Sequence, residues 1–443
     1  MSEVKNTNNT IGQTLPKPDT ITNVQQTTCC IVGGGPTGAV LALLLARQGV
    51  PVMLLEAHKN FDRDFRGDII HAGVMEIMDE LGLTDSLLKQ IPHTKTDKIS
   101  FMTSKQAITF ADFSRLRTRH PYATIIPQVK FLEFLTAEAR RYPHFQLLMG
   151  ANVQELIEED GIIRGVRYRG NDGWHEVRAL LTIGADGRFS RIRQLAGMEL
   201  IKSSSSMDLL WFRLPRRPEE PEGLIARFGC RRILVTYNNF ENNWQIAYII
   251  PKGYYRQLRA SNIEALRQSI VEFVPEFADR VEHIKDWNQA SLLSVEVGCL
   301  SRWYRSGLLL IGDAAHVMSP VGGVGINYGI QDAVVAANVL GDPLKAGHVR
   351  LSHLAAVQRQ RELSVRTTQA FQSFIQKHII TKALQSNNTL RLPIYLRLPL
   401  LRDIPARLLS FGIWPAHVKN KFSLQDGDKN VAGRSSDTAA LTQ

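Results

Sequence analysis

The sequence predicts an α/β protein whose parallel-sheet domain is interrupted by a β-rich insert and followed by a helical segment. A short β-branched run at residues 27–32 ends in three glycines, and a helical pattern and a second apolar run follow it directly. Between about residues 200 and 297, strand-like segments alternate or are β-branched, which is typical of an antiparallel sheet. At residues 307–311 the chain returns to the buried-strand type. This order predicts a first domain that the chain leaves, to build a second sheet, and then re-enters.

Length and composition are those of an ordinary globular protein. The chain has 443 residues, 44% hydrophobic and 21% charged, which is enough apolar material for two or three structural units. Its 53 basic and 42 acidic residues give a formal charge of +11. The basic residues are dispersed and form no block with interleaved aromatics, so we expect no nucleic-acid partner.

The four cysteines are too few for a disulfide scaffold and show no metal-ligand spacing. Cys29 and Cys30 are adjacent in an apolar run, and we expect buried thiols, no bound metal and a cytoplasmic location. No run of 18 or more apolar residues occurs, so no spanning helix is expected. Residues 1–26 are polar and have no signal-peptide core, and residues 422–443 are also polar. We expect both ends to be disordered.

The first domain opens with a strand–turn–helix–strand unit of a parallel sheet, at residues 27–32, 37–48 and 52–56. Its other elements are expected to be helices at 75–81, 128–141 and 326–340 and strands at 145–149, 162–168, 179–185 and 307–311. The insert is expected to have strands at 98–102, 107–110, 209–214, 232–237 and 244–250 and a helix at 262–273.

These elements divide the chain into three parts. The discontinuous first domain takes residues 27–94, 126–200 and 298–345, and the β-rich insert takes residues 95–125 and 201–297. Residues 346–421 form the C-terminal helical region.

The turn at residues 33–38 matches the pattern GxGxxG. Gly33 permits a tight turn, Gly35 lets a pyrophosphate approach the backbone, and Gly38 lets the helix pack on the strand. The start of that helix offers free N–H groups and a positive dipole end to phosphates. Glu56, at the end of the next strand, stands where an acid accepts a hydrogen bond from an unphosphorylated ribose. This Rossmann-like unit predicts FAD or NAD; the alternative is a structural glycine turn with a surface glutamate.

Two later stretches follow buried strands. One is Gly-Ala-Asp-Gly at residues 184–187. The other is Gly-Asp-Ala-Ala-His at residues 312–316, which leads into Pro-Val-Gly-Gly-Val-Gly-Ile-Asn at residues 320–327. With these three motifs in order over about residues 27–345, the chain resembles the group A flavoprotein monooxygenases, the family of the aromatic hydroxylases. Within that family it looks closest to a bacterial subgroup described broadly as FAD-dependent oxidoreductases.

The resemblance implies a set of residues that contact FAD. They are Gly33, Gly35, Pro36, Thr37, Gly38, Glu56, Arg66, Gln128, Asp186, Gly187, Gly312, Asp313, Pro320, Gly322, Gly323, Val324, Gly325, Ile326 and Asn327. Asp313 is expected to bond the ribityl chain, and the loop that starts at Pro320 is expected to lie beside the isoalloxazine. A glycine loop that enters a helix aims N–H groups and a dipole at the negative charge of reduced flavin.

The resemblance also implies the reaction. NADH or NADPH reduces FAD, O2 adds to give a flavin C4a-hydroperoxide, and an oxygen atom passes to an aromatic, phenolic or quinone-like small molecule. The insert would form the far wall of the substrate pocket. Its candidate lining residues are Trp211, Arg213, Tyr237, Trp244 and Tyr248, and the alternative for each is a place in the core of the sheet.

His71, His316 and Pro320 are candidates for a contact near the flavin. The alternative for His71 is a structural hydrogen bond, and the alternative for His316 is a turn or packing histidine. Related chemistries also stay open: a prenyl reductase, a flavin halogenase, and a non-enzymatic lipid carrier on the same fold. The segment 390–420 spaces arginines among leucines and prolines. It fits either a peripheral membrane contact or a helical cap on the FAD domain. Oligomeric state is not predicted.

Overall fold

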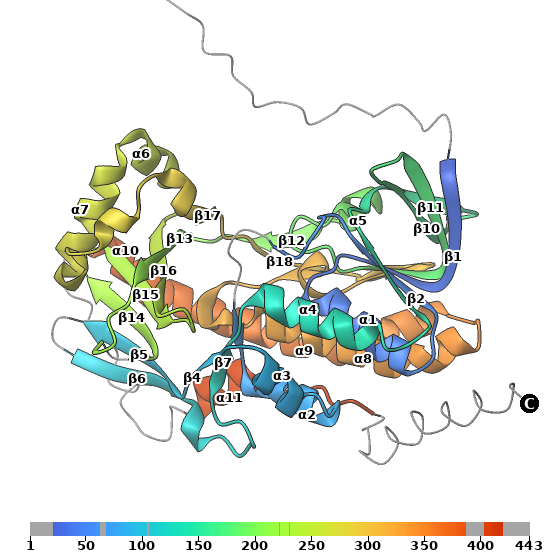
Figure 1. The fold of residues 1–443 in the computed structure, drawn as a ribbon, viewed down its shortest axis with the longest axis horizontal. Coiled ribbons are helices and arrows are strands. Elements are labelled where there is room, and N and C mark those ends of the chain that lie inside the picture. The colour runs from blue at the N-terminus through green and yellow to red at the C-terminus, as the bar shows by residue number, and fades with distance from the viewer. Residues whose placement is uncertain are drawn as a thin grey trace, which may run out of the picture.

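The computed structural model describes residues 21–62, 68–103, 106–220, 222–229, 231–386 and 403–419 (Figure 1). Two sheets with separate helical layers dominate the described part. One lies in the discontinuous first domain and the other in the insert, as the sequence predicts. Arg66, the whole 390–402 stretch and both chain ends lie outside the described residues.

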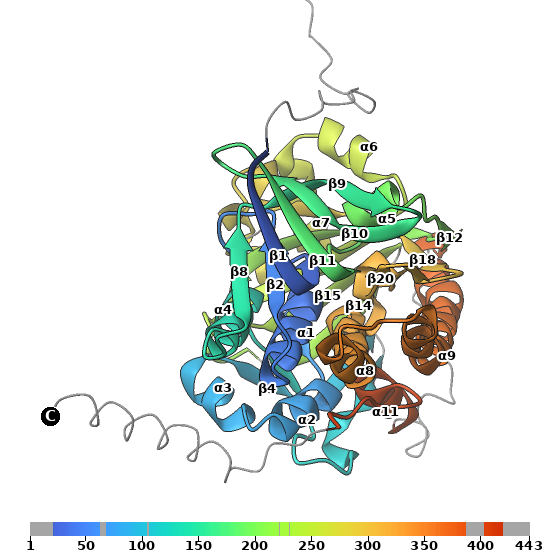
Figure 2. The ribbon, with the colours of Figure 1, turned by 90° about the vertical axis from the view of Figure 1, so that its right-hand side faces the viewer.

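An eight-stranded sheet forms the centre of the first domain, in the order β19-β20-β11-β1-β2-β8, with β10 and β9 continuing from β11. Its strands are β1 (Ile21–Val32), β2 (Val52–Glu56), β8 (Phe145–Met149), β9 (Asn152–Glu159), β10 (Ile162–Arg169), β11 (Trp174–Gly184), β19 (Tyr304–Arg305) and β20 (Leu308–Leu310). The pairs β1–β11, β1–β2, β2–β8 and β11–β20 are parallel. Figure 2 shows β1 between β2 and β11, with their carboxyl ends at one edge.

Strand β1 begins at Ile21, so the prediction that residues 21–26 are disordered is wrong. This part of the strand pairs in parallel with the first half of β11, from Ile21 opposite Trp174 onward. Its side chains are exposed or half-buried, and Val24 is 52% exposed. Backbone pairing alone orders this polar segment, and a search for apolar patterns cannot detect it.

Helices cover one face of this sheet and continue into the C-terminal region (Figure 1). Helix α1 packs against α4 and α8, and α8 packs against α9. The helices of this part are α1 (Pro36–Arg47), α2 (Ala72–Glu80), α3 (Thr84–Gln90), α4 (Gln128–Ala139), α5 (Arg191–Leu195), α8 (Gly325–Lys345), α9 (Leu351–Ile375), α10 (Thr381–Gln385) and α11 (Asp403–Phe411). A π-helical turn, η7 (Gln376–Ile380), joins α9 to α10.

The insert is a seven-stranded sheet in the order β17-β13-β16-β15-β14-β5-β6. Its strands are β5 (Lys98–Thr103), β6 (Gln106–Asp112), β13 (Met207–Pro215), β14 (Leu224–Gly229), β15 (Arg232–Asn238), β16 (Asn243–Pro251) and β17 (Ser291–Leu293). The two predicted segments of the insert therefore meet, through a parallel pair between β5 and β14. All the other pairs in this sheet are antiparallel.

Both faces of the insert sheet are covered. Helices α6 (Tyr255–Ala260) and α7 (Ile263–Phe273) and three short 3-10 turns, at 275–277, 281–283 and 287–289, cover the outer face and close a separate apolar core with it. The inner face turns toward the first domain and joins the main core.

Two small sheets contain strands from both predicted domains, so the domain boundaries in the structure differ from the predicted ones. β4 (Thr94–Thr96) and β7 (Ala123–Ile125) lie almost entirely within the predicted insert segment 95–125. In the structure β7 pairs with β3 (Ile69–Ile70) of the first domain on one side and with β4 on the other. A second sheet contains β12 (Leu200–Ser203), β18 (Val297–Leu300) and β21 (His316–Val317). Short 3-10 turns at 113–115, 312–314 and 321–323 complete the described elements.

No helix among the described residues combines the length and apolar character needed to cross a bilayer.

Candidate cofactor and substrate site

A cavity of about 970 Å³ lies between the two domains and reaches every predicted motif that the structure describes. From the first domain it is lined by Gly33, Gly35, Pro36, Thr37, Glu56, Gln128, Asp186, Gly187, Asp313, Pro320, Gly322, Gly323, Val324, Gly325 and Ile326. From the insert it is lined by the inner face of the sheet, by residues of α6 and by the segment 287–296. One space therefore joins the predicted cofactor residues to the predicted substrate wall.

The glycine turn has the geometry that a dinucleotide requires. Gly33 has φ +109°, and a Cβ there would overlap the Ala185 carbonyl. A Cβ at Gly38 would overlap the Gly33 carbonyl oxygen, so this glycine is needed for the helix to pack on its own turn. At Gly35, by contrast, a Cβ would meet nothing within 4 Å. Gly35 faces the cavity, which leaves its backbone open to a phosphate.

Glu56 is held by the glycine turn itself. Its Oε2 accepts the Gly34 N–H at 2.9 Å, and its Oε1 accepts the His58 N–H at 2.9 Å. The His58 ring lies 2.7 Å from the same oxygen. Both side chains line the cavity, and Glu56 itself is only 2% exposed. His58, which the motif does not include, therefore adds a second polar group at the ribose end.

Asp186 has two roles in the structure. It lines the cavity, but its carboxylate also accepts the Ser190 hydroxyl at 2.6 Å and the Ile192 N–H at 3.0 Å at the start of α5. Burial is the largest effect on its carboxyl and raises its pKa above the usual range. Arg193 then links this motif to the next, because its guanidinium donates to the Ala314 carbonyl at 2.9 Å.

The turn at Gly312 and Asp313 brings α1 and α8 together. Gly312 has φ +59°, and its missing side chain leaves room for the hydroxyl of Thr37. Gly329 on α8 makes room for the same hydroxyl. Asp313 lines the cavity beside Gly325, at the start of α8. The Asp313 carboxylate is thus placed at the start of α8, one residue after the contact of Gly312 with Thr37 of α1.

The loop that follows Pro320 is built from left-handed glycines. Gly322 has φ +80° and Gly323 has φ +64°, backbone conformations that side-chain-bearing residues rarely adopt. Helix α8 begins directly afterwards with no side-chain cap and no acidic residue in its first turn. Its first N–H groups, at Gly325 and Ile326, therefore have no capping side chain, and both residues line the cavity.

Asn327 and His71 support this loop from beneath, and neither lines the cavity. Asn327 Oδ1 accepts the His71 N–H at 2.8 Å, and its amide nitrogen lies 3.3 Å from the carbonyl oxygens of Ile69 and Gly323. The His71 ring Nε2 lies 2.8 Å from the Gly322 carbonyl oxygen. Burial lowers the pKa of His71 to about 4, so the ring is neutral and donates this hydrogen bond. The structure supports the structural alternative for His71.

His316 also has a structural place, in a buried ion network that the motifs do not reveal. Its Nε2 lies 2.5 Å from Asp332 Oδ2, which also accepts the Gly312 N–H at 3.0 Å. The second oxygen, Asp332 Oδ1, accepts from Arg361 Nε at 2.8 Å. All three side chains are at most 1% exposed. Through Asp332, the C-terminal helix α9 is tied to the turn that carries Asp313.

The substrate candidates divide by face of the insert sheet. Trp211 and Tyr237 line the cavity. Trp244 and Tyr248 do not, because they point to the opposite face and pack in the core under α7. Their polar atoms are satisfied there: Trp244 donates to Glu220 at 2.7 Å, and the Tyr248 hydroxyl lies 2.8 Å from that of Ser269. For these two residues the prediction of a pocket role is wrong.

Arg213 shares the inner face with Trp211 but lies beyond the cavity. Its Nε donates to Gln245 Oε1 at 2.9 Å, and its guanidinium lies 3.6 Å from Glu241. Half of the side chain is exposed. Arg213 therefore orders the edge of the sheet and does not line the pocket.

Three lining residues come from a region where no site was predicted. Ile375, Ile379 and Ile380, from α9 and the π-helical turn η7, line the same cavity. The helical pattern of this segment shows apolar residues but not what they face.

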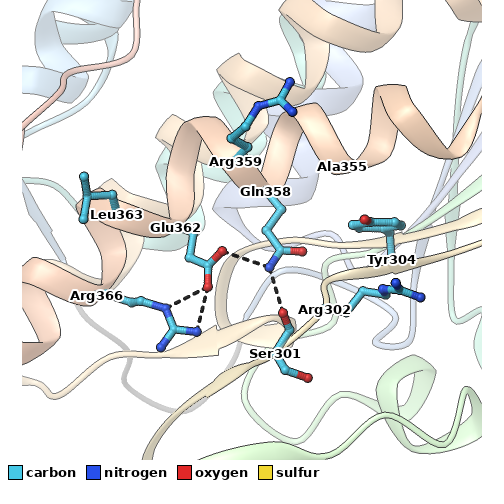
Figure 3. A pocket seen from close by; sticks show the side chains of 9 residues that line it. All are labelled: Ser301, Arg302, Tyr304, Ala355, Gln358, Arg359, Glu362, Leu363 and Arg366. Atoms are coloured by element: carbon cyan, nitrogen blue, oxygen red, sulfur yellow. Dashed lines mark hydrogen bonds and ion pairs between the residues drawn. The ribbon is translucent and has the colours of Figure 1, made fainter.

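A second hollow, of about 600 Å³, lies outside this site, on the surface between α9 and the turn at residues 301–304 (Figure 3). In it, Arg366 pairs with Glu362, and Gln358 donates to the Ser301 carbonyl and to Glu362. No predicted site residue lines it. Among the described residues, no group of three or more His, Cys, Asp or Glu side chains could hold a metal ion.

The residues present fit FAD. The open face of Gly35 and the uncapped starts of α1 and α8 suit a pyrophosphate and an anionic ring. The carboxylates of Glu56 and Asp313 line the cavity and provide hydrogen-bond acceptors for the ribose and ribityl hydroxyl groups of FAD. Past these residues the cavity extends to the apolar inner face of the insert sheet, a surface that the binding of a dinucleotide does not require.

Comparison with known proteins agrees with this geometry. A family model described as "FAD binding domain" matches residues 26–370. The 6-methylpretetramide 4-monooxygenase of Streptomyces rimosus is 36% identical over 76% of this chain and 80% of its own length. The 12-dehydrotetracycline 5-monooxygenase/anhydrotetracycline 6-monooxygenase of S. rimosus subsp. rimosus is 29% identical over 69% of this chain, and the match spans 60% of that relative.

Among solved structures, P. aeruginosa PqsL in complex with 2-aminobenzoylacetate superposes with a TM-score of 0.70 at 20% identity, covering 82% of this chain and 97% of that one. At this identity the likeness shows the fold. The family match, by contrast, extends over most of the chain. The chain is a member of the group A flavoprotein monooxygenases, an FAD-dependent aromatic hydroxylase.

Proposed function

We propose that this monooxygenase takes electrons from NADH or NADPH and uses O2 to hydroxylate a phenolic or quinone-like aromatic molecule. The observation that carries the proposal is the cavity between the two domains, which is lined both by the cofactor motifs and by the apolar inner face of the insert sheet. The name of the S. rimosus relative, 6-methylpretetramide 4-monooxygenase, supports an oxygenation reaction, and that of another relative, pentachlorophenol 4-monooxygenase, supports a phenolic substrate.

When bound, FAD supplies the redox and oxygen chemistry, and the protein supplies position and environment. The N–H groups at Gly325 and Ile326, with the dipole of the 21-residue helix α8, would face the negative charge of the reduced ring. The insert sheet would exclude water from the reacting atoms. Asp313 and Glu56 would hold the ribityl and ribose hydroxyls.

The proposal is tested by substrate-stimulated oxidation of NADH and of NADPH, with mass spectrometry of the product. We expect the FAD-loaded enzyme to add one oxygen atom to a phenolic ring, and no product to form when O2 is removed. A gain of two hydrogens would instead indicate a prenyl reductase. A colourless protein that binds no FAD would indicate a lipid carrier, and either result would contradict the proposal.

We also propose a cytoplasmic location with a peripheral membrane contact through the C-terminal region. Cys29, Cys30 and Cys299 are free buried thiols, which suits a reducing compartment. Leu409 of α11 packs against Gly322 in the loop at residues 320–324, called the flavin loop, and this contact fits a helical cap. The nearby Ile413 and Trp414 are 40% and 56% exposed, which supports a surface contact.

We expect the full chain to sediment with liposomes that contain anionic lipid, and the double substitution I413S/W414S to reduce the bound fraction severalfold. F189S is the matched control, because Phe189 is 66% exposed but lies at the cofactor cleft. If the double variant binds liposomes as well as the unchanged chain does, then the membrane contact is wrong and α11 is a cap only.

A further inference from the structure

The inner face of the insert sheet changes from polar to apolar along its strands. Strand pairing places Arg213, Gln245 and Tyr237 side by side in one row across β13, β16 and β15. Gln245 is 1% exposed and joins this row to β13 by accepting from Arg213 and donating to the Phe212 carbonyl.

Beyond this polar row the face is apolar. The next row on the same face is Trp211, Ala247 and Val235, and the row after it is Leu209, Ile249 and Ile233. All six residues line the cavity. The isoleucines of α9 and η7 extend the same apolar surface, and no residue in these two rows carries a charge.

The polar row contributes Tyr237 to the cavity lining, and the hydroxyl of this residue is buried and has no hydrogen-bond partner. Tyr237 lines the cavity and is 1% exposed, yet its oxygen makes no hydrogen bond in the structure. A buried hydroxyl without a partner costs stability, so its retention indicates a ligand group that completes it. Tyr248, on the opposite face of the same sheet, is already paired with Ser269.

Tyr237 belongs to the end of the cavity that lies near the flavin loop. The Thr94 hydroxyl donates at 3.0 Å to the carbonyl of Asn238, the residue that follows Tyr237. Thr94 is linked through β7 to Ile69, and Ile69 packs against Gly323. Burial, and then the charge of Asp68, raise the pKa of Tyr237 well above its usual value. The phenol therefore stays protonated and can donate a hydrogen bond.

We propose that the substrate is an uncharged, extended aromatic molecule with an oxygenated ring at one end, and that the Tyr237 hydroxyl hydrogen-bonds to the oxygen of that ring. The anchored ring lies at the end of the cavity near Gly323, and the remaining rings lie along the apolar rows. This inference rests on the proposed hydroxylase function and adds the substrate class and a specificity-determining residue to it. A carboxylate on the rings that lie along the apolar rows is disfavoured, because neither row offers its charge a partner.

Binding can be tested without turnover, by titrating the FAD-loaded full chain and following the visible absorption of the flavin. The probes are 2-naphthol and naphthalene, which differ by one hydroxyl, and methyl 6-hydroxy-2-naphthoate and its free acid, which differ by one charge. We expect 2-naphthol to bind about fivefold to tenfold more tightly than naphthalene, the value of one hydrogen bond. We expect the ester to bind at least about tenfold more tightly than the acid.

Y237F should abolish the preference for 2-naphthol over naphthalene and leave the thermal midpoint unchanged or higher, since it removes an unpartnered hydroxyl. Y248F, on the other face of the sheet, should keep the preference. The inference is overturned if the acid binds as well as the ester, if Y237F keeps the preference, or if no neutral probe binds. If the probes bind as expected but NADH and NADPH yield no oxygenated product from any bound ligand, the hydroxylase proposal fails while the binding inference stands.

Discussion

Replacing Asp332 by alanine should lower the free energy of unfolding by about 3–5 kcal/mol, because it leaves a buried guanidinium without its counter-charge. Arg361 is 1% exposed and donates to Asp332 at 2.8 Å. The substitution also removes the acceptor of the Gly312 N–H and the partner of His316. The measurement is urea unfolding of D332A and of the unchanged chain, followed by circular dichroism.

The loss should depend on pH. Burial alone would raise the pKa of Asp332, but the charges and hydrogen bonds of His316 and Arg361 outweigh it and hold that pKa below the usual range. The carboxylate therefore stabilises the fold fully above the ordinary aspartate pKa and loses this effect as the pH falls through its lowered value. The difference in the free energy of unfolding between D332A and the unchanged chain should therefore become smaller at acidic pH.

Asp342, on the same helix, provides the control. Its side chain is 92% exposed and pairs with Lys345, so D342A should leave the unfolding curve unchanged. Equal unfolding midpoints for D332A and the unchanged chain at neutral pH would contradict a stabilising role for the network.

Replacing Gly35 by valine should weaken FAD binding by at least about 100-fold, roughly 2.8 kcal/mol, without unfolding the protein. Gly35 has φ −72° and ψ 179°, an extended conformation that any residue adopts, and a Cβ there meets no atom within 4 Å. The valine side chain would instead enter the space beside the start of α1 that the pyrophosphate needs. The measurement is the FAD dissociation constant of the apo-protein, by quenching of flavin fluorescence.

Gly38→Val is the informative contrast, since its side chain would overlap the Gly33 carbonyl. G38V should lose thermal stability as well as FAD, whereas G35V should lose only FAD. If G35V purified with a full complement of flavin, the open face of Gly35 would not be where the pyrophosphate lies.

The sequence predicts the cofactor side of this site well, because its chemistry depends on short local patterns. A turn that needs left-handed or side-chain-free backbone must contain glycine, so Gly33, Gly38 and Gly322 can be recognised from the chain alone. Acids that directly follow buried strands, such as Asp186 and Asp313, also lie where the strand ends meet.

The sequence does not show which residues of the insert sheet line the cavity. Alternation along β16 shows that Trp244 and Tyr248 share a face, but it does not show which face turns toward the cofactor. Both faces of this sheet are apolar because α7 covers one of them. Which face turns toward the cofactor depends on how the insert packs on the first domain, and no local sequence pattern predicts that packing.

The ion network has no local signature either. Asp332 lies within an apolar helix, and its partners are 16 residues away at His316 and 29 residues away at Arg361. A polar residue at a core position predicts that some partner exists, but only the packing of α8 on α9 identifies it.

The packing of Leu409 against Gly322 bears on how the enzyme is made in the cell. The ribosome synthesises every glycine motif by about residue 327, but the helix that supports the flavin loop, Asp403–Phe411, emerges some 80 residues later. A nascent chain that already contains every glycine motif therefore still lacks the helix that packs against Gly322, beside the expected position of the flavin ring. We therefore expect stable capture of FAD only after Asp403–Phe411 has been synthesised, and the rate of flavin loading should then govern how long new molecules remain in the apo form.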